Sequence, residues 1–241
     1  MTGKFDGIVL DGRETINEAV DIGNLNVTGQ ILFTRMVNAN AVEIAGQAQF
    51  GSLLTCDKLT VSGECRAKGD VMTQHIKIRG GTIWFYDKVY SETILSAGEI
   101  TAYDVIHSGR INLNKEAMLD TTATIKSDVL KVFGKIRSTS SVKSTEIHIV
   151  SDKASEVRNV ITDILVVRRP KSEERRFEGR KTYALTSDFI DCIEADLSAC
   201  YIGQLYCDSA IIRSGCVIDE LLYNKEVEIE PGAVVERLVK A

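Results

Sequence analysis

A glycine recurs at an almost constant step through the first hundred residues, and this repeat constrains the fold more than any other feature of the chain. The series is Gly12, Gly29, Gly46, Gly63, Gly80 and Gly98, with a step of 17 four times and then one of 18. Each of the first five glycines follows a pair of apolar residues separated by one residue, as Leu25 and Val27 precede Gly29. Such alternation is typical of β-strands, and self-similarity at a fixed short period is typical of solenoids. The sequence therefore predicts a β-solenoid with about 17 residues per turn.

Two further apolar columns follow the same period. One begins after each glycine, as at Ile31/Phe33 and Ala48/Phe50. The other contains nine aliphatic residues at steps of 17 to 19, namely Val20, Val37, Leu54, Val71, Val89, Ile106, Ile125, Val142 and Val160. Three short strands per turn predict an all-β fold with a triangular coil, in which the apolar side chains of successive turns stack inside.

The repeat divides the chain into three parts. Residues 1–167 form the expected main β-helix of about ten turns. Residues 168–182 read as a charged excursion or linker, because this stretch has many charges and cannot supply an apolar face. Residues 183–241 form further β-helical turns, since the block 215–221 returns as 232–238 at the same step. The sequence leaves open whether these turns continue the first solenoid or form a second one.

Composition limits the range of partners. The net charge of −5 and the pI of about 5.4 argue against a nucleic-acid partner. No run of 18 apolar residues occurs, and the first residues lack the features of a signal peptide, so we expect a cytoplasmic protein. The glycine-containing turns match no phosphate-binding motif, and we expect no cofactor.

The six cysteines do not have the spacing of a metal site. None forms a C-x-x-C pair, and the three histidines lie far from most of them. We therefore expect no metal site and interpret the cysteines as core residues. In the repeat, Cys65 lies in register with Ile31 and Ala48.

Three blocks of the repeat resemble the bactofilins, the polymer-forming cytoskeletal proteins of bacteria. They are LNVTGQI (25–31), VEIAGQA (42–48) and LTVSGECRAKGDV (59–71). The resemblance implies a right-handed triangular β-helix that assembles end to end into non-polar filaments without nucleotide. It also implies a scaffold that positions envelope- or motility-associated machinery, with the chain itself, a paralogous bactofilin and envelope-associated proteins as partners.

The chain departs from the layout of that family in its length and its charged interruption. Many bactofilins carry a short apolar membrane-targeting peptide at the N-terminus, whereas only MTGKF precedes the first expected strand here. We therefore expect no direct membrane insertion, and a position in the cytoplasm or at the inner face of the membrane.

The terminal turns are the expected polymerisation interface. The end of a solenoid leaves backbone groups unpaired, and monomeric solenoids cover this edge with a cap. Apolar residues of the terminal turns could instead stack on a second molecule. They are Ile8, Leu10, Val227, Ile229, Val234, Val235 and Leu238. The alternative is that another segment of the chain covers an end.

Two other groups of residues are candidate partner contacts. Alternation in the run 82–90 turns Trp84 and Tyr86 outward, where they could bind a partner or could simply be exposed. The basic residues of the excursion could bind an anionic lipid or an acidic partner, or could form a solvated loop. The ones we single out are Arg168, Arg169, Arg175 and Arg176.

Two alternative functions remain at this stage. One is a β-solenoid adaptor that does not polymerise. The other is a left-handed β-helix acyltransferase, suggested by the hexapeptide-like stretches 210–218 and 227–235. In that fold the number of residues per turn is a multiple of six, commonly 18, whereas a step of 17 dominates here. Such enzymes also use a histidine base, and the last histidine of this chain, His148, precedes both hexapeptide-like stretches. We therefore expect no enzyme activity.

Overall fold

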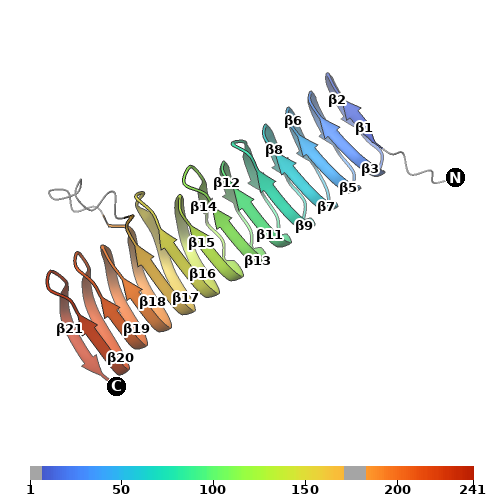
Figure 1. The fold of residues 1–241 in the computed structure, drawn as a ribbon. Helices are drawn as coiled ribbons and strands as arrows, with labels where there is room; N and C mark the ends of the chain where they lie inside the picture. The colour runs from blue at the N-terminus through green and yellow to red at the C-terminus, as the bar shows by residue number, and fades with distance from the viewer. Residues whose placement is uncertain (1–6, 171–182) are drawn as a thin grey trace. The chain divides into compact units, whose positions relative to one another are not determined.

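A computed structural model describes residues 7–170 and 183–241 of the chain. Within these ranges the protein consists of parallel strands and contains no helix. The strands stack as a β-solenoid of about 13 turns with roughly 17 residues per turn, which confirms the predicted fold class. The chain divides into two compact units, residues 1–123 and 124–241, and each is described separately below. Figure 1 labels the strands and colours the chain from blue at the N-terminus to red at the C-terminus.

Each full turn of the first unit contains a long and a short strand, after an initial short strand β1 (Ile8–Leu10). The long strands are β3 (Val20–Val27), β5 (Val37–Ile44), β7 (Leu54–Val61), β9 (Val71–Ile78), β11 (Val89–Ser96) and β13 (Ile106–Leu113). The short strands are β2 (Arg13–Ile16), β4 (Gln30–Phe33), β6 (Gln47–Phe50), β8 (Glu64–Ala67), β10 (Thr82–Phe85), β12 (Glu99–Ala102) and β14 (Met118–Thr121).

Every long strand is bent, so each turn presents three inward-facing segments. In β5, Val37 and Ala39 are buried, and burial then resumes at Val42 and Ile44. The step of three between Ala39 and Val42 breaks the strand period of two, and the parallel pairing with both neighbouring strands is interrupted at Asn40. The predicted three strands per turn thus appear as the two halves of a long strand plus one short strand.

Close stacking of the turns explains the glycine column. A Cβ atom built on Gly46 would lie 2.2 Å from the carbonyl oxygen of Gly29, and one on Gly63 would lie 2.1 Å from that of Gly46. No side chain fits at such distances, so glycine is needed for the approach of two backbones. The column passes through Gly81 rather than Gly80, because a step of 18 pairs Glu64 with Thr82.

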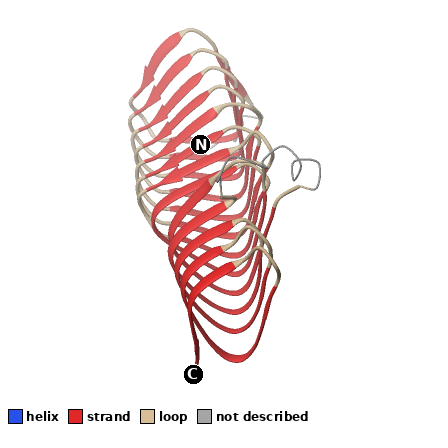
Figure 2. Cartoon of the chain, turned by 90° about the vertical axis from the view of Figure 1, so that its left-hand side faces the viewer, coloured by secondary structure: helices blue, strands red, loops and turns tan. Residues whose placement is uncertain are grey.

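The described part of the second unit has seven strands, and in five of them the segments of a turn merge into 13 to 16 residues. The seven strands are β15 (Ile125–Val132), β16 (Lys135–Val150), β17 (Ser155–Arg168), β18 (Leu185–Leu197), β19 (Cys200–Ile212), β20 (Val217–Ile229) and β21 (Val234–Lys240). Successive turns lie side by side, as the red strands of Figure 2 show.

The turns on either side of the charged excursion stack directly on each other. Strand β17 pairs in parallel with β18, and Leu165 is in register with Ala195 on the far side of the excursion. The pairing continues on both sides of this position, from Ser155 with Leu185 to Val167 with Leu197. Strands β17 and β18, which residues 169–184 separate in the sequence, therefore belong to adjacent turns of one solenoid unit.

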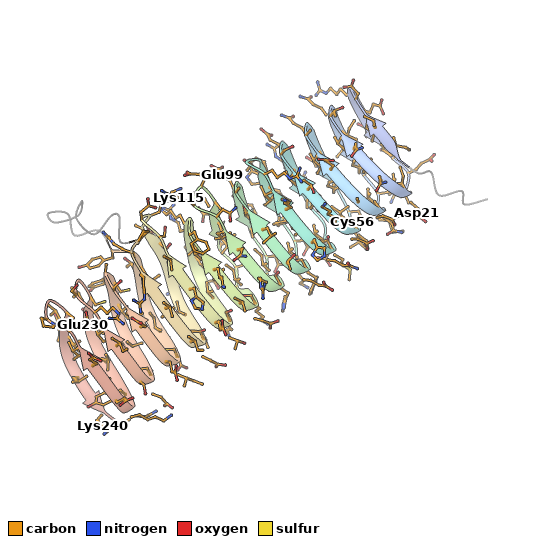
Figure 3. The ribbon with its side chains drawn as sticks, viewed as in Figure 1. Asp21, Cys56, Glu99, Lys115, Glu230 and Lys240 are labelled. Atoms are coloured by element: carbon orange, nitrogen blue, oxygen red, sulfur yellow. The ribbon has the colours of Figure 1, made fainter. Side chains whose placement is uncertain are left out.

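The core consists of stacked aliphatic, aromatic and thiol side chains. Phe33 and Phe50 stack with their ring centroids 5.0 Å apart and their planes 3° from parallel. All six cysteines are free and buried, which confirms their interpretation as core residues (Cys56 is labelled in Figure 3). Burial raises the pKa of Cys56 to about 11, so this thiol stays protonated near neutral pH.

A column of small polar residues lies at the bend of the long strands. Ser91 donates a hydrogen bond to the hydroxyl of Ser108 over 3.1 Å, and Ser108 donates to the backbone carbonyl of Arg110 over 3.1 Å. In the second unit Ser144 donates in the same way to the carbonyl of Glu146, over 2.9 Å. These hydroxyls thus make hydrogen bonds across the residue at which the strand pairing is interrupted, Gly109 or Thr145.

Candidate assembly interface

The first turn of the first unit exposes side chains that are buried in every later turn. Ile8 is in register with Leu25, and Leu10 with Val27, so both residues of β1 belong to core columns. Leu25 is 1% exposed, whereas Ile8 is 38% exposed. Strand β3 covers one edge of β1, and no described strand pairs with the other edge. The first turn is therefore an open end among the described residues.

The last turn of the second unit is open in the same way. Leu238 of β21 is in register with Leu221, and Val235 with Ile218. Leu221 is fully buried, whereas Leu238 is 47% exposed because no described turn follows it. Lys240 lies on this last turn and its ammonium group is 5.8 Å from the ring centroid of Tyr223 (Figure 3).

The end of β20 belongs to the same open surface. Strand β21 pairs with residues 217–223 of β20, and the described chain offers no partner to the outer edge of 226–229. Val227 and Ile229 are core positions, in register with the buried Ala210 and Ile212. Ile229 is nevertheless 40% exposed.

Val234 differs from the other six predicted interface residues in its orientation. It is in register with Val217, a half-buried residue that precedes the core position Ile218. Its neighbour Val235 occupies the core column, and Val234 is 51% exposed on the outer face. Stacking of a further turn would thus cover Val235 and Leu238 directly but leave Val234 at the periphery.

A ladder of ion pairs links four successive turns near this end. Arg168 pairs with Asp196, which also accepts a hydrogen bond from Nε of Arg213 over 2.6 Å. Arg213 in turn pairs with Glu230 over 2.6 Å (Figure 3 labels Glu230). Burial opposes ionisation of Asp196, but its contacts with Arg213 and Arg168 outweigh this cost and hold the pKa of its carboxyl below the usual value.

Of the predicted basic contacts, Arg168 is thus engaged within the chain. Arg169 is half-buried, and this burial lowers the pKa of its guanidinium. Arg175 and Arg176 lie outside the described residues.

Of the two aromatic candidates, Trp84 lies in β10 and Tyr86 follows the end of that strand. Trp84 is half-buried, and the guanidinium carbon of Arg66 lies 5.0 Å from its ring centroid. Tyr86 is exposed and stacks on Tyr103 of the next turn at 5.1 Å. Both aromatic side chains therefore already pack against neighbours in the first unit.

The described residues contain no group of three histidine, cysteine or acidic side chains that could hold a metal ion. No helical segment suited to spanning a membrane occurs in that part of the chain either. In comparisons with protein-family models, curated proteins and solved structures, nothing matches this chain.

Proposed function

We propose that this protein is a bactofilin-like cytoskeletal scaffold whose solenoid ends stack on other copies to form filaments without nucleotide. The observation that carries the proposal is the pair of open ends. At each one, core-column side chains such as Ile8 and Leu238 are exposed and the strand edge has no described partner. Edges of this kind pair readily with another chain.

The joint would form from the same interactions that hold the turns together. A further turn would pair with the free backbone edge and cover the exposed core side chains. Full burial of one aliphatic side chain contributes about 1.5–3 kcal/mol, and each backbone hydrogen bond adds about 0.5–1.5 kcal/mol. Several buried side chains and several backbone hydrogen bonds at each joint can together offset the entropy lost on association.

Such filaments would act in the cytoplasm, at the inner face of the membrane, by presenting a regular array of outer faces to client proteins. This role requires no catalysis. A paralogous solenoid with a similar open end could share the joint. The second candidate is an adaptor that binds a partner at one end without polymerising.

Electron microscopy of the purified protein without nucleotide, with light scattering on the same sample, tests the proposal. We expect filaments from the unmodified chain and none from Ile8→Arg or Leu238→Glu, because each change places an uncompensated charge in the joint. Val234→Glu is the matched control, since it adds the same charge to the same strand on its outer face.

The fold of each variant is checked by circular dichroism. Filaments that persist in both Ile8→Arg and Leu238→Glu would show that the terminal turns do not form the joint. Dispersed particles of the unmodified protein at high concentration would favour the adaptor.

A further inference from the structure

A groove crosses one outer face of the second unit. It has a volume of about 530 Å³ and lies over the last segment of four successive strands, β17 to β20. The outward side chains of these segments are in register and form two columns. One column is Ile164, Glu194, Ser209 and Glu226, and the other is Val166, Asp196, Ile211 and Glu228.

The central part of the groove is a trough because β19 contributes a small residue between two large ones. Ser209 lies between Glu194 of the preceding turn and Glu226 of the following turn. Beside Ser209, Ile211 is the apolar residue of the trough, between Asp196 and Glu228 of the neighbouring turns. Ile164 and Val166 of β17 lie beyond Glu194 and Asp196, in the outer part of the groove. The trough therefore runs along the strand direction above β19.

The rims of this trough are acidic. Glu194 stands on one side, with Glu226 and Glu228 on the other, and no lysine or arginine is among the residues that line the groove. Asp196 is neutralised by Arg168 and Arg213, whereas Glu226 and Glu228 have no ion pair within the described ranges 7–170 and 183–241. The nearby cation Lys225 is already paired with Asp208 over 2.7 Å.

The spacing of the rims argues for an extended polypeptide and against a metal ion. Turns are about 4.8 Å apart, so carboxylates two turns apart are separated by about 10 Å at their backbones. Two carboxylates that share one cation have to approach within about 5 Å. An extended chain fits between such rims, with alternate side chains directed to the floor.

We infer that this groove binds an extended segment of a partner protein in which basic and apolar side chains alternate. The apolar side chains would contact Ile211 and its neighbours, and the basic ones would reach Glu194 and Glu226. The net charge of −5 on a second copy of this chain opposes its approach to the acidic rims. This inference does not depend on filament formation.

Fluorescence anisotropy with a labelled short peptide of alternating lysine and leucine tests the inference. Two control peptides separate the contribution of charge from that of apolar contact. One has glutamate in place of lysine, and the other has serine in place of leucine. We expect the lysine–leucine peptide to bind at least tenfold more tightly than either control, at an ionic strength of about 0.15 M, where long-range attraction is screened.

Charge reversal of the rims in Glu194→Lys/Glu226→Lys should weaken this binding at least tenfold. The matched control is Glu92→Lys/Glu99→Lys, which makes the same change in net charge at two exposed carboxylates of the first unit. A second variant, Ser209→Phe, fills the trough without a change of charge and should also weaken binding at least tenfold.

Equal binding to the two charge-reversal variants would overturn the inference, because it would show attraction to overall charge alone. Unaltered binding to Ser209→Phe would also overturn it. Light scattering of each variant is recorded in parallel. If the groove variants change self-association and leave peptide binding unaltered, the groove binds a second copy and the inference is wrong.

Discussion

Ala199 has a backbone conformation that L-residues rarely adopt. Its φ is 52°, and it is the one residue other than glycine with a positive φ in the described part of the chain. The corresponding corner positions of the next two turns are Gly215 and Gly232, with φ of 78° and 89°. The left-handed conformation costs an L-residue about 1–2 kcal/mol, and glycine adopts it without this cost.

We therefore predict that Ala199→Gly stabilises the protein by about 0.5–1 kcal/mol, after the greater chain entropy of glycine in the unfolded state is subtracted. Urea unfolding followed by circular dichroism measures the change. Ala195→Gly is the control, since Ala195 is buried within β18 and its φ is not positive. We expect the control to lose stability, and an Ala199→Gly variant no more stable than the unmodified protein would contradict the prediction.

At the same scale, single residues show what the sequence could and could not predict. The core columns can be read from the sequence because apolar residues recur in each of them at a nearly fixed step. The choice between Gly80 and Gly81 was not readable, since both are glycine and only the pairing of Glu64 with Thr82 decides between them. The outward direction of Val234 also depends on the register with β20, because it stands beside another valine.

At the scale of elements, the ion-pair ladder joins strands that are distant in sequence. Arg168 ends β17, Asp196 lies in β18, and Arg213 follows β19. These residues meet because β17 pairs with β18 across an insertion, and β18 then pairs with β19 after a shorter turn than usual. A constant period in the sequence does not predict such a ladder, because the sequence step between paired residues of these strands changes from turn to turn.

The ladder makes part of the stability dependent on pH. The pKa of Asp196 is below its ordinary value of 3.8 in the folded protein, so the folded state favours the ionised form. Its contribution is therefore complete above the pKa of the unfolded state, near pH 4, and is lost as the pH falls through the folded-state pKa.

We predict that Asp196→Asn lowers the free energy of unfolding at pH 7, and that the difference from the unmodified protein shrinks toward pH 2. Chemical denaturation at a series of pH values measures this. Asp21→Asn is the control, because Asp21 is an exposed residue of the first unit whose contact is a hydrogen bond from Asn38. A loss of stability in Asp196→Asn that is the same at pH 7 and pH 2 would contradict the prediction.

At the scale of the whole molecule, the two open ends are chemically different. The first turn offers Ile8 and Leu10, whereas the last offers Ile229, Val235 and Leu238. A non-polar filament, which the resemblance to bactofilins implies, then needs two kinds of joint. Each joins identical ends about a two-fold axis, and each uses one end alone. A polar filament would have a single kind of joint, made from one end of each type.

The non-polar and the polar filament differ in the oligomer that remains when a charged substitution disrupts one end of the chain. In a non-polar filament Leu238→Glu abolishes the joint between last turns but keeps the joint between first turns, so it should leave dimers of twice 26.5 kDa. Ile8→Arg should leave dimers held by the last turns, and the double variant should be monomeric. In a polar filament each single variant already lacks the one joint and should be monomeric. Sedimentation velocity of the three variants, with Val234→Glu as the polymerising control, therefore decides between them, and monomers from either single variant would rule out the non-polar arrangement.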